Sequence, residues 1–142
     1  MSTKIRKKRK TQKRRGLKVN KEALRILRTL NAEETFYFYE DIGKPTGESA
    51  KSLLDFLEKI KSVKLESLLF HFQRKDFQNW IEKILGDSKL ARRMEKIVPL
   101  SEGDVRAKIC TAIENRINEL REASVTLLVN QDLAVAVSSS TS

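Results

Sequence analysis

Apolar residues recur at helical spacing along most of this chain. The first such stretch covers 20–30 and starts at Asn20, a residue type that favours the N-cap of a helix. Its apolar residues fall at i, i+3, i+4 and i+7, which places them on one helical face. A second stretch with this spacing extends from Ala50 to about Val63, after the Gly- and Pro-containing segment 43–47. Both stretches are predicted to be amphipathic helices.

The segment 65–84 contains two apolar stripes that differ in phase. Each stripe follows helical spacing, but the second is offset from the first by twelve residues, which does not correspond to whole helical turns. We therefore predict two helices with a break across 73–76, and Asp76 as a candidate cap of the second. The stripes consist of Leu65, Leu68, Leu69 and Phe72, and of Phe77, Trp80, Ile81 and Ile84.

Two further helices complete the helical part of the chain. Gly86 is typical of a helix C-terminus and Asp87 of the next N-cap, so 88–97 is predicted to be a helix that ends before Pro99. The most regular apolar spacing predicts a helix from Asp104 to about residue 122. Five or six helices with short connections indicate an all-α fold, in the form of a single small bundle.

Two segments fit more than one structure. In 31–47, Asn31 and Glu34 resemble a capping box, whereas the run TFYFY is rich in residues that favour strands; we favour a helix. In 123–142, two apolar, β-branched runs flank 130–132 and a Ser/Thr-rich end follows. This apolar C-terminal segment is consistent with a hairpin, a helix extension or a tail that needs a partner.

The net charge of the chain is confined to its N-terminal end. The 142 residues include 29 basic and 19 acidic ones, for a formal net charge of +10. Ten basic residues and no acidic residue lie in 1–18, so 19 basic and 19 acidic residues remain in 19–142. Because 1–18 is also almost free of apolar residues, it is predicted to be a disordered basic arm. A helical domain is predicted to follow at 19–122.

The basic arm has the composition of a segment that binds polyanions. Each Lys or Arg brought to a phosphate releases counterions, which gives a salt-sensitive and sequence-independent affinity. No aromatic residue is interleaved, so the arm offers no stacking platform for bases. We therefore expect a non-enzymatic nucleic-acid-binding protein with a ribosome- or chromatin-associated role, and DNA and RNA are equally compatible. The predicted nucleic-acid-binding residues are Lys4, Arg6, Lys7, Lys8, Arg9, Lys10, Lys13, Arg14, Arg15 and Lys18.

The alternative is a protein–protein interaction module in which the arm serves targeting or solubility. Phe56 and Phe70 fall off the central stripes of their predicted helices, so they fit either a partner groove or a wide buried face. The apolar segment within 123–142 is a second candidate for partner contact.

Catalytic and metal-binding chemistry is weakly represented. His71, the single histidine, is predicted to point away from its apolar stripe. In a catalytic role, His71 would act as a general base oriented by Asp76. The spacing places no Ser or Cys nucleophile near it, so a polar surface or capping arrangement is favoured. His71 and Cys110 match no zinc spacing, and no metal or cofactor is predicted.

The single cysteine and the absence of long apolar runs bear on location. One cysteine excludes an intramolecular disulfide and fits a reducing, cytoplasmic compartment. No apolar run follows the basic N-terminus as in a secretory signal, and none is long enough to span a bilayer. The sequence therefore predicts an intracellular protein without a membrane span.

Several motifs within 35–97 are similar to those of an uncharacterised family found mainly in archaea. They are an aromatic pair at Phe36 and Phe38, Gly-x-x-x-Gly-x-Ser-Ala at 43–50, Phe-His at 70–71, Asp-Phe-x-x-Trp-Ile at 76–81 and Leu-Gly-Asp-x-x-Leu-Ala at 85–91. The resemblance implies a small, mainly helical domain, with no particular activity. It also implies a shared structural or binding feature formed by His71, Arg74, Asp76 and Trp80.

Overall fold

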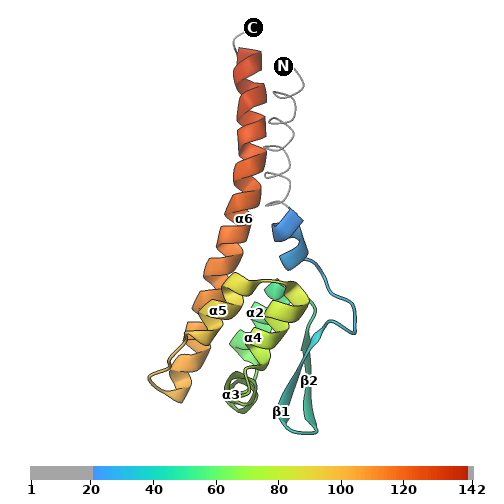
Figure 1. Cartoon of the computed structure of the whole chain (residues 1–142), viewed down its shortest axis with the longest axis vertical. Helices are drawn as coiled ribbons and strands as arrows, with labels where there is room; N and C mark the ends of the chain where they lie inside the picture. Colours follow the sequence, from blue (N-terminus) through green and yellow to red (C-terminus); the bar gives the residue numbers. More distant parts are fainter. Residues whose placement is uncertain (1–20, 141–142) are drawn as a thin grey trace, which may run out of the picture. The chain divides into compact units, whose positions relative to one another are not determined.

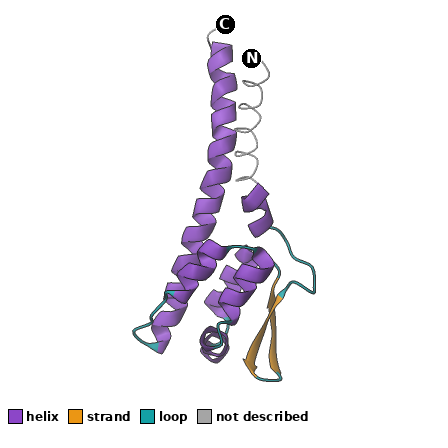
Figure 2. Cartoon of the chain, in the orientation of Figure 1, coloured by secondary structure: helices purple, strands orange, loops and turns teal. Residues whose placement is uncertain are grey.

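The computed structural model describes residues 21–140, and for 124–140 it describes the backbone alone. After a helical segment at 21–26, the elements are β1 (Phe36–Asp41), β2 (Lys44–Ala50), α2 (Leu53–Ser62), α3 (Leu65–Gln73), α4 (Asp76–Trp80), the π-helical turn η1 (Ile81–Leu85), α5 (Ser88–Glu95) and α6 (Glu102–Ser140) (Figure 1). The described part of the chain is mainly helical, as predicted, and contains a two-stranded antiparallel sheet (Figure 2). The predicted arm at 1–18 and the predicted cap at Asn20 lie outside the described residues.

The prediction of an all-α fold, with a helix within 31–47, is wrong because a β-hairpin forms at 36–50. Phe36 and Phe38 are buried, whereas Tyr37 and Tyr39 between and after them are exposed. This alternation is the period-two pattern of a strand with one face on the core. Strand-favouring aromatic side chains therefore outweigh the capping-box pattern that precedes them.

The hairpin also shifts the start of the following helix. Ala50 pairs with Phe36 in the sheet, so it does not begin a helix as predicted. α2 begins at Leu53 instead, and the hydroxyl of Ser52 accepts the backbone N–H of Asp55 as its N-cap. The Gly-containing connection at 42–43 reverses the chain between the two strands.

The predicted break between the two stripes of 65–84 is confirmed. Lys75 has φ 62°, in the left-handed region, so the helical path is interrupted between α3 and α4. Asp76 does not cap α4 as predicted but lies in its first turn. Its carboxylate contacts His71 and Arg74 instead.

The predicted boundary at Gly86 and Asp87 is confirmed and carries a buried ion pair. Gly86 has φ 75° and ends the π-helical turn. Asp87 Oδ1 accepts the backbone N–H of Leu90 at 3.1 Å and so caps α5, while Oδ2 accepts from Arg116 Nε at 2.8 Å. The side chains of Asp87 and Arg116 are 1% and 9% exposed, so this contact links α5 to α6 inside the fold.

The residues Arg25–Ile117 form a compact unit with an aromatic core. Phe36, Phe38, Phe56 and Phe77 are buried, and the ring centroids of Phe56 and Phe77 lie 5.3 Å apart. Phe56, considered above for a partner groove, therefore belongs to the core. The edge-to-face pair of Phe56 and Phe77 and the tilted pair of Phe36 and Phe77 add to the stabilisation from apolar burial.

α6 is longer than the helix predicted to end near residue 122. Its backbone continues to Ser140, so the helix extension is the alternative that the structure adopts for 123–140. None of the helices in the described part of the chain combines the length and apolarity that crossing a bilayer requires.

Candidate functional site

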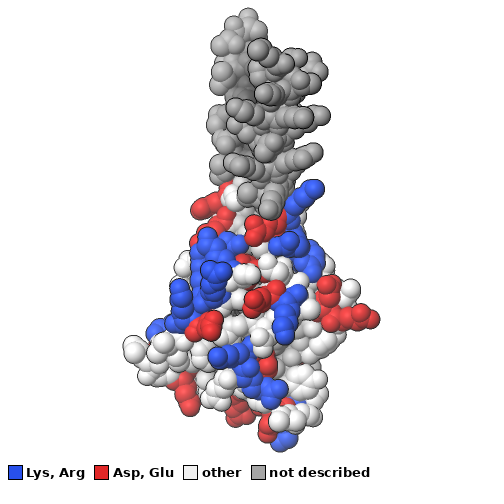
Figure 3. Space-filling model, viewed as in Figure 1, with Lys and Arg blue, Asp and Glu red and all other residues white. Residues whose placement is uncertain are grey.

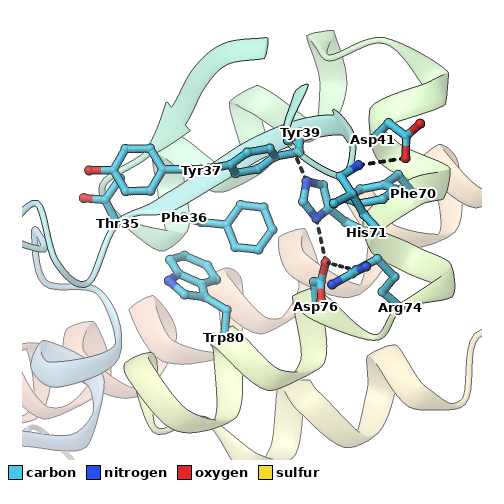
Figure 4. A pocket seen from close by; sticks show the side chains of 12 residues that line it. Thr35, Phe36, Tyr37, Tyr39, Asp41, Phe70, His71, Arg74, Asp76 and Trp80 are labelled. Atoms are coloured by element: carbon cyan, nitrogen blue, oxygen red, sulfur yellow. Dashed lines mark hydrogen bonds and ion pairs between the residues drawn. The ribbon is translucent and has the colours of Figure 1, made fainter. Parts of the chain in front are cut away.

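A hollow of about 500 Å³ lies beside β1, against residues of α3 and α4 (Figure 4). β1 and the adjoining turn supply one wall, and the ends of α3 and α4 supply the other. The residues that line it are Thr35, Phe36, Tyr37, Tyr39, Asp41, Ile42, Gly43, Phe70, His71, Arg74, Asp76 and Trp80. The structure thus brings the four residues of the predicted shared feature to one place, and adds residues of the hairpin to them.

His71 is buried, at 4% exposed, and not on a polar surface as predicted. Its Nε2 lies 2.8 Å from the backbone nitrogen of Tyr39, and its Nδ1 lies 2.8 Å from Asp76 Oδ2. A backbone N–H can only donate, so Nε2 must accept and Nδ1 must carry the proton that it donates to Asp76. Both ring nitrogens of the neutral imidazole are therefore occupied within the fold.

Burial lowers the pKa of His71 below its usual value, and the hydrogen bond and charge of Asp76 act in the opposite direction without outweighing burial. The hydrogen bond from Tyr39 is consistent with this direction, because protonation of Nε2 would place two donors against each other. The Nε2 lone pair of the imidazole accepts the backbone N–H at the edge of β1. It is therefore not available to act as a general base in this arrangement.

Arg74 is held at the rim of the hollow by two contacts. Its Nε donates to Asp76 Oδ2 at 3.3 Å, and its guanidinium carbon lies 4.9 Å from the centroid of the Phe70 ring. The side chain is 51% exposed, and its two terminal nitrogens have no partner among the residues that the structure describes. The guanidinium is thus oriented but keeps free hydrogen-bond donors.

Two aromatic side chains of the hollow, those of Tyr37 and Trp80, are fixed by hydrogen bonds of their polar ends. The hydroxyl of Tyr37 donates to the carbonyl of Ala32 at 2.8 Å, and Trp80 Nε1 donates to the carbonyl of Glu34 at 2.8 Å. Trp80 is almost fully buried, whereas Tyr37 and Tyr39 are 50% and 37% exposed. The hollow therefore has an ordered aromatic wall whose tyrosine rings remain accessible.

Sequence reasoning missed Tyr37, Tyr39 and Asp41 as members of this site. The signal in the sequence is the alternation of Phe and Tyr over 36–39, which fits a strand with one buried face and which the helical interpretation of this segment obscured. The predicted nucleic-acid-binding residues, Lys4 to Lys18, all lie outside the described residues. Within 21–140, no group of three or more His, Cys, Asp or Glu side chains is arranged to hold a metal ion.

The fold and the hollow define a small, mainly helical domain with a β-hairpin and an aromatic-lined site. The model of DUF5752, a family of unknown function, matches residues 33–131. Since this span is well over half of the chain, the protein belongs to that family. The match contains every residue that lines the hollow and leaves out 1–32. Neither the curated proteins nor the solved structures contain a match to this chain.

Proposed function

We propose that this protein is a cytoplasmic, non-enzymatic nucleic-acid-binding protein whose basic N-terminal segment contacts phosphates without sequence preference. One observation carries the proposal: 1–18 contains ten basic and no acidic residues, and 19–142 is formally neutral. On the face shown in Figure 3, the basic and acidic side chains of the described residues are interspersed. Ion pairs such as Lys59–Glu48, at 3.0 Å, pair some of these charges. Attraction to a polyanion would thus come mainly from 1–18.

The environments of His71, which was considered for catalysis, and of Cys110, the single cysteine, support the non-enzymatic part of the proposal. His71 uses both ring nitrogens for contacts inside the fold, to Tyr39 and Asp76. Cys110 is half-buried, and burial raises the pKa of its thiol, so little of the nucleophilic thiolate is present at neutral pH.

The test compares two full-length variants that lose the same amount of positive charge. In the first, five residues of the N-terminal segment are changed to Gln: Arg6, Lys7, Lys8, Arg9 and Lys10. In the second, five exposed lysines of the body are changed to Gln: Lys44, Lys51, Lys83, Lys89 and Lys96. Both are titrated with duplex DNA and with structured RNA across a salt series.

The first variant is expected to lose most of the affinity and to have a smaller salt dependence, whereas the second should bind almost as the native chain does. If all ten basic residues of 1–18 contact duplex DNA, the slope of log K against log salt approaches about −9. Equal affinity of the two variants would contradict the proposal. A preference for DNA or RNA in the same titrations would decide which polynucleotide the protein binds, with DNA favouring a chromatin-associated role and RNA a ribosome-associated one.

A second candidate function, a protein–protein interaction module, is supported by exposed apolar side chains between α5 and α6. Val98 and Leu100 are 74% and 90% exposed, and Val98 borders a hollow of about 490 Å³ that Ala107 and Ala112 also line. Clustered exposed apolar residues mark contact surfaces more often than isolated ones do. Size-exclusion chromatography of the native chain and of Val98→Ser/Leu100→Ser would test this candidate, because a self-associating surface would shift the native chain to larger size.

A further inference from the structure

The exposed face of β1 offers two flat aromatic surfaces to the hollow. The pairing of β1 with β2 shifts register between Tyr37 and Tyr39, but both residues are exposed while Phe38 between them is buried, so their side chains emerge on the same face. The hydrogen bond from the Tyr37 hydroxyl to Ala32 fixes that ring before any ligand arrives, which lowers the entropy lost on binding. Exposed aromatic side chains on a strand are a common platform for unpaired bases, because every base has a flat π-face.

The polar rim of the hollow presents donors and acceptors side by side. Arg74 has free N–H donors at its terminal nitrogens, as described above. Asp76 Oδ2 is occupied by His71 and Arg74, but Oδ1 has no partner within the described residues. Asp41 is exposed, and its Oδ1 accepts the backbone N–H of Ile42 while Oδ2 is free among those residues. A bound group can therefore both accept hydrogen bonds and donate them.

The charges of this rim select against strongly charged ligands. Arg74 and Asp76 compensate each other, the imidazole of His71 is neutral, and Asp41 leaves at most one uncompensated negative charge. A phosphate bound inside the hollow would face two carboxylates, and an ammonium group would face the guanidinium. An uncharged planar ring with donors and acceptors along its edge is not repelled by either the carboxylates or the guanidinium.

Nucleobases have this combination of properties. Arginine pairs with base acceptors such as O6 and N7 of guanine, and carboxylates accept from base amino groups. The volume of about 500 Å³ is also in the usual range of small-ligand sites, roughly 300–1,000 Å³. We propose that the hollow binds one unpaired nucleobase, stacked on Tyr39, whose ring centroid lies 6.4 Å from that of His71, and hydrogen-bonded at its edge by Arg74 and the two carboxylates.

This inference rests on the proposed function for the source of the base, a polynucleotide whose phosphates are contacted by 1–18. It adds a preference for single-stranded segments, which phosphate contacts alone do not supply. Because the family match includes the hollow and excludes 1–32, the base site would belong to the part of the chain that defines the family.

The test uses the full chain and the fluorescence of Trp80, the single tryptophan, which lines the hollow. The chain is titrated with the four ribonucleosides, which have no phosphate for the basic residues to contact. It is then titrated with single-stranded and duplex oligonucleotides of equal length. We expect the emission of Trp80 to change with at least one nucleoside, and single strands to bind more tightly than duplexes.

Variants separate stacking from effects on folding. Tyr39→Ala should weaken single-strand binding by roughly tenfold through the loss of a stacked base. Tyr39→Leu keeps apolar bulk without a flat ring and should weaken binding similarly. Tyr37→Phe keeps a flat ring but loses the hydrogen bond to Ala32 that fixes it, so it should weaken binding by less than either Tyr39 variant. Leu100→Ala, an exposed apolar residue outside the hollow, is the matched control and should have no effect. Circular dichroism establishes that each variant is folded.

Two outcomes distinguish the failure of this inference from the failure of the proposed function. No response of Trp80 to any nucleoside at millimolar concentration, together with equal affinity for single strands and duplexes, would overturn the base site. Salt-sensitive polynucleotide binding that depends on 1–18 would still support the proposed function in that case. Nucleoside binding that persists when the five residues of 1–18 are changed to Gln would support the base site independently.

Discussion

His71 Nε2 accepts the backbone N–H of Tyr39 at 2.8 Å, and this hydrogen bond joins α3 to β1. A backbone donor left unpaired at this partly buried strand edge would cost free energy, and the imidazole supplies the missing acceptor. The second ring nitrogen is held by Asp76, so the histidine has one orientation. The same contacts place Tyr39 and Asp76 on opposite walls of the hollow.

His71→Ala should lower the free energy of unfolding by about 2–4 kcal/mol, because it leaves the Tyr39 N–H unpaired and opens space in the aromatic core. Urea denaturation followed by circular dichroism measures the change. The matched control is Arg74→Gln, which removes an exposed partner of Asp76 and should cost less than about 1 kcal/mol, as the loss of an exposed ion pair usually does. Similar losses in both variants would contradict a structural role for the imidazole.

The stability of the protein should decrease as the pH is lowered through the range where His71 titrates. Burial lowers the pKa of His71 in the folded protein, so the unfolded chain binds a proton more readily. The stabilisation is present above the unfolded pKa of about 6.5 and is lost as the pH falls toward the folded pKa. Urea midpoints measured from neutral to mildly acidic pH should show this slope in the native chain and a smaller one in His71→Gln. An unchanged slope in the variant would assign the titration to other groups.

Arg116→Met should destabilise the protein by about 3–5 kcal/mol, because it leaves the buried carboxylate of Asp87 without its cation. Asp87→Asn keeps the Oδ1 atom that caps α5 and removes the charge. The double variant Asp87→Asn/Arg116→Met has no buried unpaired charge, so it should be more stable than Arg116→Met alone. Thermal and urea unfolding would measure the difference. Strictly additive losses would show that the two side chains do not interact energetically.

Gly86→Ala and Gly103→Ala should change stability in different ways. Gly86 has φ 75°, and an added Cβ would lie 3.3 Å from Nε of Arg25, so the variant should be destabilised by about 1–2 kcal/mol. Gly103 lies in α6 without positive φ and with open space around it, so alanine there should be neutral or stabilise by up to about 1 kcal/mol. Differential scanning calorimetry compares the two, and equal shifts in Tm would contradict the left-handed role of Gly86.

Cys110 should react slowly with iodoacetamide in the folded protein. Burial raises the pKa of its thiol, and the negative charge of Glu114 acts in the same direction. Mass spectrometry of timed samples should show faster alkylation in urea than in native buffer at neutral pH. The same rate in both conditions would mean that the thiol is as accessible and as acidic as in the unfolded chain.

The helical part of the fold was predictable because its signals are local. The break near Lys75, the helix end at Gly86 and the cap at Asp87 depend on side chains and φ angles within a few residues of each boundary. The segment 31–47 contained both a capping-box pattern and strand-favouring residues, and local signals did not decide between them. The strand forms where Phe36 and Phe38 pack into the aromatic core and pair with β2, which are contacts with distant residues.

The sequence by itself determined the helix boundaries near Lys75, Gly86 and Asp87, the confinement of net charge to 1–18 and the nearness of His71 to Asp76 along the chain. Only the tertiary structure decided that His71 is buried and that Tyr37, Tyr39 and Asp41 share its hollow. Caps and charge counts depend on neighbours along the chain. The protonation of an imidazole and the walls of a hollow depend instead on which elements pack together. Asp76 is near His71 along the chain, but the hydrogen bond to Nε2 comes from Tyr39, 32 positions away.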